Sequence, residues 1–214
     1  MIKLIIFDFD GTLGDTRANI VLTMQETLRA LGYPVSDEDT IAATIGLTLE
    51  DGFRELIPGL TDADTLRCAD FYRELFELNR KKMVPKLFPH VDETLRSLKD
   101  RGFILTVASS RQSGSLKGFL HDMSVEDCIS FVLGADSVEK AKPDPEPVLK
   151  TMQEMDIPPE ESIVVGDMPV DIIMGRRAGT STVGVTYGNS SREALAEAGA
   201  DMIIDDISEI LGLV

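Results

Sequence analysis

The feature that most constrains this chain is a short apolar run near its N-terminus that ends in two carboxylates. Residues 2–7 read I-K-L-I-I-F, which is typical of a strand buried on both faces of a parallel sheet. Asp8 and Asp10 follow at once, and Gly11 permits a sharp turn. Residues two apart on a strand share a face, so the carboxylates meet at the strand's C-terminal end, where open α/β sheets bind ligands. Crowded carboxylates repel one another, and a bound cation would relieve that cost.

The same stretch resembles the first sequence motif of a known family. Residues 8–13 read D-F-D-G-T-L and are followed by Asp15 and Thr16, as in the haloacid-dehalogenase superfamily of Mg²⁺-dependent aspartyl-phosphate phosphohydrolases. Calcium-binding loops also contain D-x-D-G, but they require Glu at the twelfth position, which Asn19 occupies here. The sequence therefore favours the superfamily over a calcium site.

A second candidate site residue, Ser109, directly follows a strand predicted over residues 103–108. A hydroxyl and free backbone N–H groups at a strand end suit a phosphate oxygen, by the same logic as a helix N-terminus. The family's second motif is an apolar strand that ends in Thr or Ser, which Ser109 matches. Ser110 stands where many relatives carry Asn, and Arg111 follows. Without the preceding strand, S-S-R would be typical of an ordinary turn.

Two further sequence segments resemble the family's third and fourth motifs. Lys142 precedes a proline in K-A-K-P-D-P, which points to it over Lys140 as the motif lysine. A predicted strand over residues 163–165 runs into G-D-x-x-x-D, which contains Asp167 and Asp171. Each segment also has a structural interpretation without catalysis. Lys142 could be a solvated loop lysine, and G-D-x-x-x-D could be a loop that caps a helix. Their order along the chain, with the strand-end motifs behind predicted buried strands, favours the family.

The resemblance implies a role for each of these residues. Asp8 would be the nucleophile, and Asp10 would protonate the leaving group and later activate water. Ser109 and Lys142 would take up phosphoryl charge, together with backbone N–H groups near Asp10. The expected cofactor is Mg²⁺, held by Asp8, the backbone carbonyl of Asp10, Asp167 and Asp171.

The hydrophobic pattern predicts a doubly wound, Rossmann-like α/β fold with a helical insertion. Residues 15–86 contain four helical patterns and no convincing strand, and the caps expected for the second, third and fourth helices are Ser36, Thr48 and Thr61. After residue 87 helices and short apolar strands alternate, and the strands are expected over residues 103–108, 131–133, 163–165, 182–185 and 202–204. We expect an α/β core of residues 1–14 and 87–214 and an all-helical cap of residues 15–86. The insertion resembles the four-helix cap of one branch of the superfamily. Residues 13–16 and 84–90 are the expected hinges between the two domains.

The substrate is predicted to be a small phosphorylated metabolite. Residues 185–201 and the cap loop Ile45–Thr48 resemble the phosphoglycolate-phosphatase branch, and a glycine in that loop lets backbone approach a small ligand. A plain helix–helix turn is the alternative for the loop. Arg17, Arg54 and Arg111 are candidate cations for a substrate carboxylate. The candidate substrate-binding residues are Gly11, Thr12, Gly46, Leu47, Thr48, Ser110 and Arg111.

Three alternatives to a phosphoglycolate phosphatase remain open. One is a sugar-phosphate mutase of the β-phosphoglucomutase type, whose members often carry Val where this chain has Thr12. Another is an inorganic pyrophosphatase of the same family. The third, from a different class, is a phosphate-binding regulatory module without turnover, which is disfavoured because every motif carboxylate is present.

Composition excludes several partners. A net charge of −16 without a basic stripe disfavours nucleic acid. No apolar run approaches the roughly 18 residues that a membrane span needs. Cys68 and Cys128 are far apart and lack metal-ligand spacing, so we expect reduced thiols and a cytoplasmic protein. The oligomeric state is not predicted.

Overall fold

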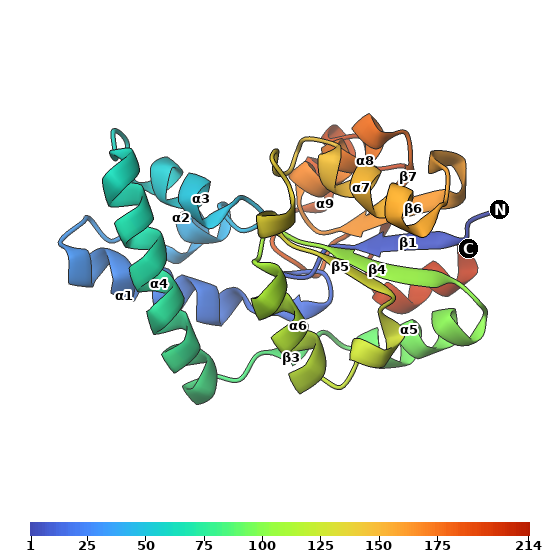
Figure 1. The fold of residues 1–214 in the computed structure, drawn as a ribbon, viewed down its shortest axis with the longest axis horizontal. Coiled ribbons are helices and arrows are strands. Elements are labelled where there is room, and N and C mark those ends of the chain that lie inside the picture. The colour runs from blue at the N-terminus through green and yellow to red at the C-terminus, as the bar shows by residue number, and fades with distance from the viewer.

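The computed structural model describes residues 1–214 and contains a six-stranded parallel sheet with helices on both faces (Figure 1). The strand next to the N-terminus lies inside the sheet, between the strands that precede Ser109 and Asp167. This arrangement confirms the predicted α/β fold. In spatial order the strands are β5 (Phe131–Leu133), β4 (Ile104–Ala108), β1 (Leu4–Phe7), β6 (Ser162–Gly166), β7 (Ser181–Val185) and β8 (Met202–Ile204).

The central strand β1 is fully buried because helices cover both of its faces. Ile5 and Phe7 belong to the larger apolar cluster, which includes residues of α5 (Val91–Asp100) and α6 (Ser113–Asp122). Leu4 and Ile6 point the other way, into a smaller cluster with α7 (Glu146–Met155) and α8 (Pro169–Ala178). The remaining elements of the core are α9 (Arg192–Glu197) and the 3-10 turns η1 (Glu126–Cys128), η2 (Ala135–Ser137), η3 (Pro159–Glu161) and η4 (Ile207–Gly212).

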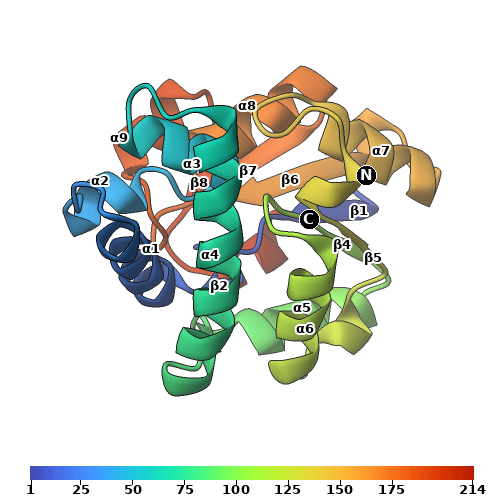
Figure 2. The same cartoon turned by 60° about the vertical axis from the view of Figure 1, so that its left-hand side comes forward.

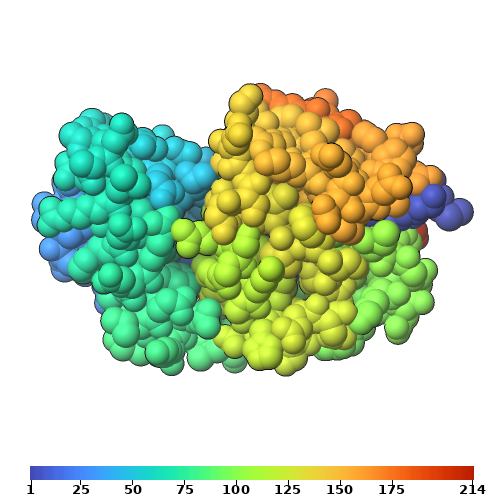
Figure 3. Space-filling model, in the orientation of Figure 1, coloured from blue at the N-terminus to red at the C-terminus, as the bar shows by residue number.

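A helical cap is inserted between β1 and β4 and forms a second lobe, coloured blue to teal (Figure 3). Thr48 and Thr61 cap α3 (Leu49–Leu56) and α4 (Asp62–Lys82) as predicted, each accepting a backbone N–H three residues ahead. The predicted cap of α2, Ser36, is wrong, because the neighbouring Asp37 accepts the Thr40 N–H instead. The cap helices are α1 (Arg17–Leu31), α2 (Glu38–Ala42), α3 (Leu49–Leu56) and α4 (Asp62–Lys82).

The two chain crossings between core and cap lie side by side. β2 (Gly14–Asp15) and β3 (Lys86–Leu87) pair in antiparallel fashion, and the Phe88 N–H donates to the Leu13 carbonyl at 3.0 Å. The sequence did not predict this ribbon, because two-residue strands are too short to show alternation. Both crossings lie in the segments expected to act as hinges.

Helix α4 of the cap lies beside α6 of the core (Figure 2), and aromatic side chains pack between the two helices. The rings of Phe76 on α4 and Phe119 on α6 meet edge to face, with centroids 6.1 Å apart. Arg80, also on α4, forms an ion pair with Asp122 at the end of α6, at 2.9 Å. Both cysteines are free and buried. None of the helices has the length and apolarity that crossing a membrane requires.

Candidate active site

Three carboxylates meet at the C-terminal edge of the sheet. Asp8 follows β1, Asp167 follows β6, and Asp171 lies in the first turn of α8. β1 and β6 are hydrogen-bonded neighbours in register, with Phe7 opposite Val165, so the residues after them share one sheet edge. One carboxylate oxygen from each of the three residues lies within 4.8 Å of the others. All three side chains are buried, which makes this cluster the candidate metal centre.

Lys142 neutralises part of this negative charge. Its ammonium donates to Asp8 Oδ1 at 2.5 Å and to Asp171 Oδ1 at 2.7 Å, and its side chain is only 2% exposed. Lys140, the alternative lysine, is exposed, with only its backbone N–H bonded, to Glu146. The structure therefore brings Lys142 and not Lys140 to the acidic cluster.

Burial and mutual repulsion perturb the ionisation of the cluster. Desolvation raises the pKa of Asp8 well above its ordinary value, against the attraction of Lys142. Desolvation, with the Asp171 charge next, raises the pKa of Asp167 to about 7. Burial would lower the pKa of Lys142, but attraction to Asp171 and Asp8 outweighs it and raises that pKa. Three carboxylates with one ammonium leave negative charge that a divalent cation would balance.

The loop after β7 supports the cluster, and sequence reasoning missed it. The Asn189 backbone N–H and side-chain amide both donate to Asp167 Oδ2, at 2.7 and 2.9 Å. Gly188 lets this loop approach, since a Cβ there would lie 2.4 Å from the Asp167 Cβ. The G-N pair behind an apolar strand was the available signal, but residues 185–201 indicated only a branch of the family.

Gly11 and Thr12 pack against the Asp167 carboxylate of the acidic cluster. Gly11 has φ +91°, and a Cβ on it would clash with the Asp167 carboxylate. Thr12 is fully buried and donates its hydroxyl to Asp167 Oδ1 at 3.1 Å. Neither residue lines the cavity described below, so their contact with substrate stays a prediction.

Asp10 is not part of the cluster of three carboxylates and pairs with Arg111 instead. The Arg111 Nε donates to Asp10 Oδ2 at 2.6 Å, and its Nη2 donates to Oδ1 at 2.7 Å. The Thr16 hydroxyl also donates to Asp10 Oδ1. The sequence predicted that Asp10 and Arg111 both belong to the site, but not that they pair with each other.

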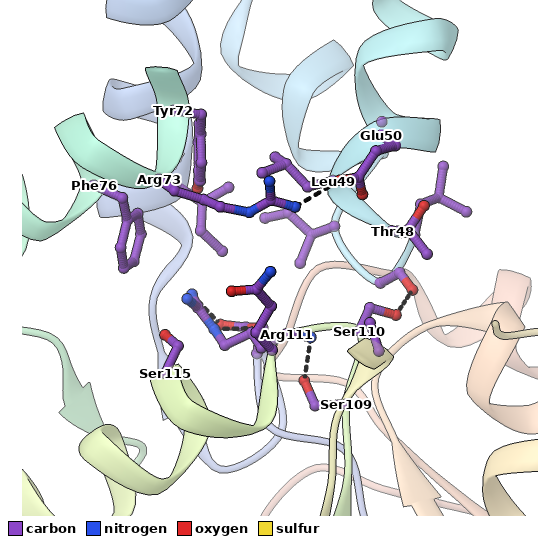
Figure 4. A pocket seen from close by; sticks show the side chains of 18 of the residues that line it. Thr48, Leu49, Glu50, Tyr72, Arg73, Phe76, Ser109, Ser110, Arg111 and Ser115 are labelled. Atoms are coloured by element: carbon purple, nitrogen blue, oxygen red, sulfur yellow. Dashed lines mark hydrogen bonds and ion pairs between the residues drawn. The ribbon is translucent and has the colours of Figure 1, made fainter. Parts of the chain in front are cut away.

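Ser109 and Ser110 follow β4, the other neighbour of β1. The Ser109 hydroxyl accepts the Arg111 backbone N–H at 3.3 Å, and Ser110 donates to the carbonyl of Gly46 in the cap at 2.6 Å (Figure 4). The second bond connects the core motif to the cap loop that the sequence indicated for specificity.

A cavity of about 660 Å³ opens over these strand ends and is roofed by the cap (Figure 4). Asp8 and Asp10 line the cavity from the core, and Arg73 of α4 lines it from the cap, paired with Glu50 at 2.6 Å. Five of the seven predicted substrate-binding residues line it: Gly46, Leu47, Thr48, Ser110 and Arg111.

Comparison with known proteins identifies the family. The model of the family described as haloacid dehalogenase-like hydrolase matches residues 5–185, a span that includes the acidic cluster, Lys142 and the cap. This chain belongs to that family. The sequence prediction of a haloacid-dehalogenase superfamily member is thereby confirmed.

Relatives of similar length support a phosphatase within this haloacid dehalogenase-like family. The chain is 35% identical to the probable phosphatase IndB of Dickeya dadantii, covering 99% of this chain and 93% of that protein. It is 30% identical to a phosphoglycolate phosphatase of Vibrio cholerae, covering 100% and 97% respectively. A solved hydrolase from Pseudomonas syringae superposes with a TM-score of 0.89 at 25% identity, covering 100% of this chain and 97% of that one. The resemblance to the phosphoglycolate-phosphatase branch is thus found along the whole chain.

Proposed function

We propose that this haloacid dehalogenase-like hydrolase is a Mg²⁺-dependent phosphatase that cleaves a small phosphate monoester, with 2-phosphoglycolate as the best candidate substrate. The observation that carries this proposal is the placement of Asp8. Its carboxylate lies at the core side of a cap-covered cavity, bonded to Lys142 and within the acidic cluster of Asp167 and Asp171. A nucleophile, a cation and a metal-binding set thus converge on one point.

In the proposed mechanism, Asp8 attacks phosphorus in line with the ester oxygen. A bond forms between an Asp8 carboxylate oxygen and phosphorus, the phosphorus–ester bond breaks, and Asp10 gives its proton to the departing alkoxide. Water then attacks the aspartyl-phosphate while Asp10 takes up a proton. The acyl-phosphate bond breaks, which releases inorganic phosphate and restores the Asp8 carboxylate.

The charge on the transferring phosphoryl group needs fixed donors. Lys142 supplies an ammonium that already contacts Asp8, and Ser109 supplies a hydroxyl on the adjacent strand end. Backbone N–H groups in the turn after β1 complete the set. Donors held by a buried sheet edge need little reorganisation when charge develops, which is how such groups lower a barrier.

The acidic cluster fits a hard divalent cation. Its donors are the carboxylate oxygens of Asp8, Asp167 and Asp171, and Asn189 Oδ1 is buried close by without a hydrogen-bond partner. An all-oxygen set without His or Cys is typical of Mg²⁺. When bound, Mg²⁺ would neutralise charge on the phosphoryl oxygens and on the nucleophile.

Phosphoglycolate is favoured by two features. The phosphoglycolate phosphatase of Vibrio cholerae aligns over the entire chain. In addition, Arg111 presents a guanidinium to the cavity, whereas Arg17 and Arg54, the other candidate cations, do not line it and pair with Asp39 and with Asp51 and Asp62 respectively.

The test is phosphate release from a panel containing 2-phosphoglycolate, pyrophosphate, sugar phosphates and nucleotides, with Mg²⁺ and with EDTA. We expect Mg²⁺-dependent release with at least a tenfold preference for 2-phosphoglycolate, about 1.4 kcal/mol of transition-state discrimination. Asp8→Asn should abolish release, whereas Asp100→Asn, at the exposed C-terminal end of α5, should not. Retained turnover in Asp8→Asn would reject the covalent mechanism.

Other outcomes of this panel would redirect the assignment. Preferential release from pyrophosphate would indicate a pyrophosphatase, and movement of phosphate between sugar positions without release would indicate a mutase. If no ester or anhydride turns over above the Asp8→Asn background, the chain is a binding module and the phosphatase proposal is wrong.

A further inference from the structure

Arg111 occupies an unusual position between the catalytic carboxylate and the cap. Its guanidinium forms a two-bond fork on Asp10 and its side chain is 12% exposed. The same guanidinium lies over the Phe76 ring of the cap at 4.7 Å and over the Phe119 ring of the core at 4.8 Å. Aromatic faces attract such a cation, so both domains hold this arginine in place.

The fork conflicts with the role proposed for Asp10. Arg111 and Thr16 donate to both carboxylate oxygens of Asp10, in the cavity that the substrate would enter. With both oxygens engaged by these donors, the Asp10 carboxylate has no free oxygen to turn toward a leaving group. Turnover by Asp10 therefore requires that Arg111 release at least one of these oxygens.

Another anion is the natural competitor for the guanidinium. The planar fork of arginine matches carboxylate and phosphate groups equally well, so a substrate anion can replace Asp10 with little loss of bonding. The other two arginines of the cavity wall form ion pairs with residues other than Asp10. Arg73 pairs with Glu50 and Asp70, and Arg80 pairs with Asp122. Arg111 is also the arginine that adjoins Asp10.

We propose that Arg111 is a specificity residue that binds a second anionic group of the substrate and, by moving onto it, frees Asp10 to act as acid and base. This inference rests on the proposed phosphatase function and narrows its substrate class. The substrate carries, besides the scissile phosphate, a carboxylate or a second phosphate near the ester oxygen. A monoester without that group leaves Asp10 bound to Arg111 and reacts slowly.

The test compares two substrates of similar size, 2-phosphoglycolate and 2-hydroxyethyl phosphate, of which only the first has a second anion. Pyrophosphate is the third arm, because its second anion is a phosphate. We expect the wild-type protein to prefer one of the two doubly anionic substrates over 2-hydroxyethyl phosphate by at least tenfold in kcat/KM. Preference for 2-phosphoglycolate assigns the group as a carboxylate, and preference for pyrophosphate assigns it as a phosphate.

Variants then assign the preference to Arg111. The selectivity ratio is kcat/KM for the preferred doubly anionic substrate divided by kcat/KM for 2-hydroxyethyl phosphate. Arg111→Gln should reduce this ratio at least tenfold, and part of the reduction should come from a lower kcat for the doubly anionic substrate. Arg111→Lys should retain a fraction of the wild-type selectivity. Arg54→Gln, which removes an exposed cap arginine, is the matched control and should leave the ratio unchanged. If Arg111→Gln does not fold, as shown by circular dichroism, Arg111→Lys alone tests the loss of the fork.

The outcomes separate this inference from the proposed function. A selectivity ratio that stays within twofold in the Arg111 variants, or a wild-type protein that cleaves all three substrates equally well, would overturn the role of Arg111 while leaving the phosphatase intact. Absence of Mg²⁺-dependent turnover with every substrate would instead reject the phosphatase itself.

Discussion

Asn189 donates two hydrogen bonds to one carboxylate oxygen of Asp167, from its backbone N–H at 2.7 Å and from its side-chain amide at 2.9 Å. Thr12 donates to the other oxygen at 3.1 Å, so the orientation of this buried carboxylate is set from both sides. The loop after β7 thereby orients a carboxylate that directly follows β6. Such supporting contacts tune the affinity of metal sites.

Asn189→Ala should weaken Mg²⁺ binding by about tenfold, since loss of an outer-shell partner typically costs 10- to 100-fold in metal affinity. The substitution keeps the backbone N–H and removes the amide and the unpartnered Oδ1. Isothermal titration calorimetry with Mg²⁺ measures the change. Ser190→Ala, which removes a hydroxyl bonded to the Met168 sulfur, is the control and should bind as the wild type does. Equal affinities in both variants would show that the Asn189 side chain is not needed to position Asp167.

Mg²⁺ affinity should fall as the pH is lowered through about 7. The pKa of Asp167 is raised to about 7 by burial and by Asp171, so in the metal-free protein a proton occupies this carboxylate below that pH. A metal requires the ionised form and must displace the proton, which links affinity to pH. Calorimetry near pH 7 in buffers of different ionisation enthalpy should detect proton release on binding. A dissociation constant that does not change between pH 6 and 8 would contradict this assignment.

Lys142→Met should abolish function and destabilise the metal-free protein. It leaves Asp8 and Asp171 buried without their cation, and breaking a buried pair costs about 3 kcal/mol or more. We expect phosphate release to fall at least a hundredfold and the urea midpoint in EDTA to shift downward. The matched control is Lys140→Met, since Lys140 is exposed and bonds only through its backbone. Equal effects of the two substitutions would show that the resemblance selected the wrong lysine.

His90 and Asp206 should make stability depend on pH. Their side chains lie 2.6 Å apart, and the hydrogen bond that the His90 ring donates to Asp206 raises the pKa of His90, while the pKa of Asp206 is lowered to about 2, chiefly by hydrogen bonds from Ser208. The stabilisation from a raised histidine pKa is complete below about 6.5 and is lost as the pH rises through the folded-state value. His90 has φ +62°, which Asn tolerates, so His90→Asn is the suitable variant.

Urea unfolding of wild type and His90→Asn at pH 5.5 and 8.5 measures this effect. The wild type should be more stable than the variant at pH 5.5, and the difference should shrink at pH 8.5. Because both side chains are exposed, we expect a small effect that salt screens further. A difference that grows with pH would mean that the pair does not form.

Much of the fold follows from local patterns that the sequence displays directly. The buried run that ends at Phe7, the two threonine caps of α3 and α4, and the glycine after α1 each specify one element by their own chemistry. The five later strands were predicted to within one or two residues because apolar runs and helices alternate. Two shorter features were not predicted. The β2–β3 ribbon is too short to show alternation, and Asp37 caps α2 instead of Ser36 because neighbouring polar residues compete for one cap position.

The sequence by itself determined which residues stand at strand ends, and parallel pairing of β4, β1 and β6 then forces Ser109, Asp8 and Asp167 onto one edge. Only the tertiary structure decided the partner of each charged group. Arg111 reaches Asp10 across 101 positions, and Asn189 reaches Asp167 from another loop. Such pairings have no local signature, because they depend on which loops and which cap face a buried carboxylate once the sheet has formed.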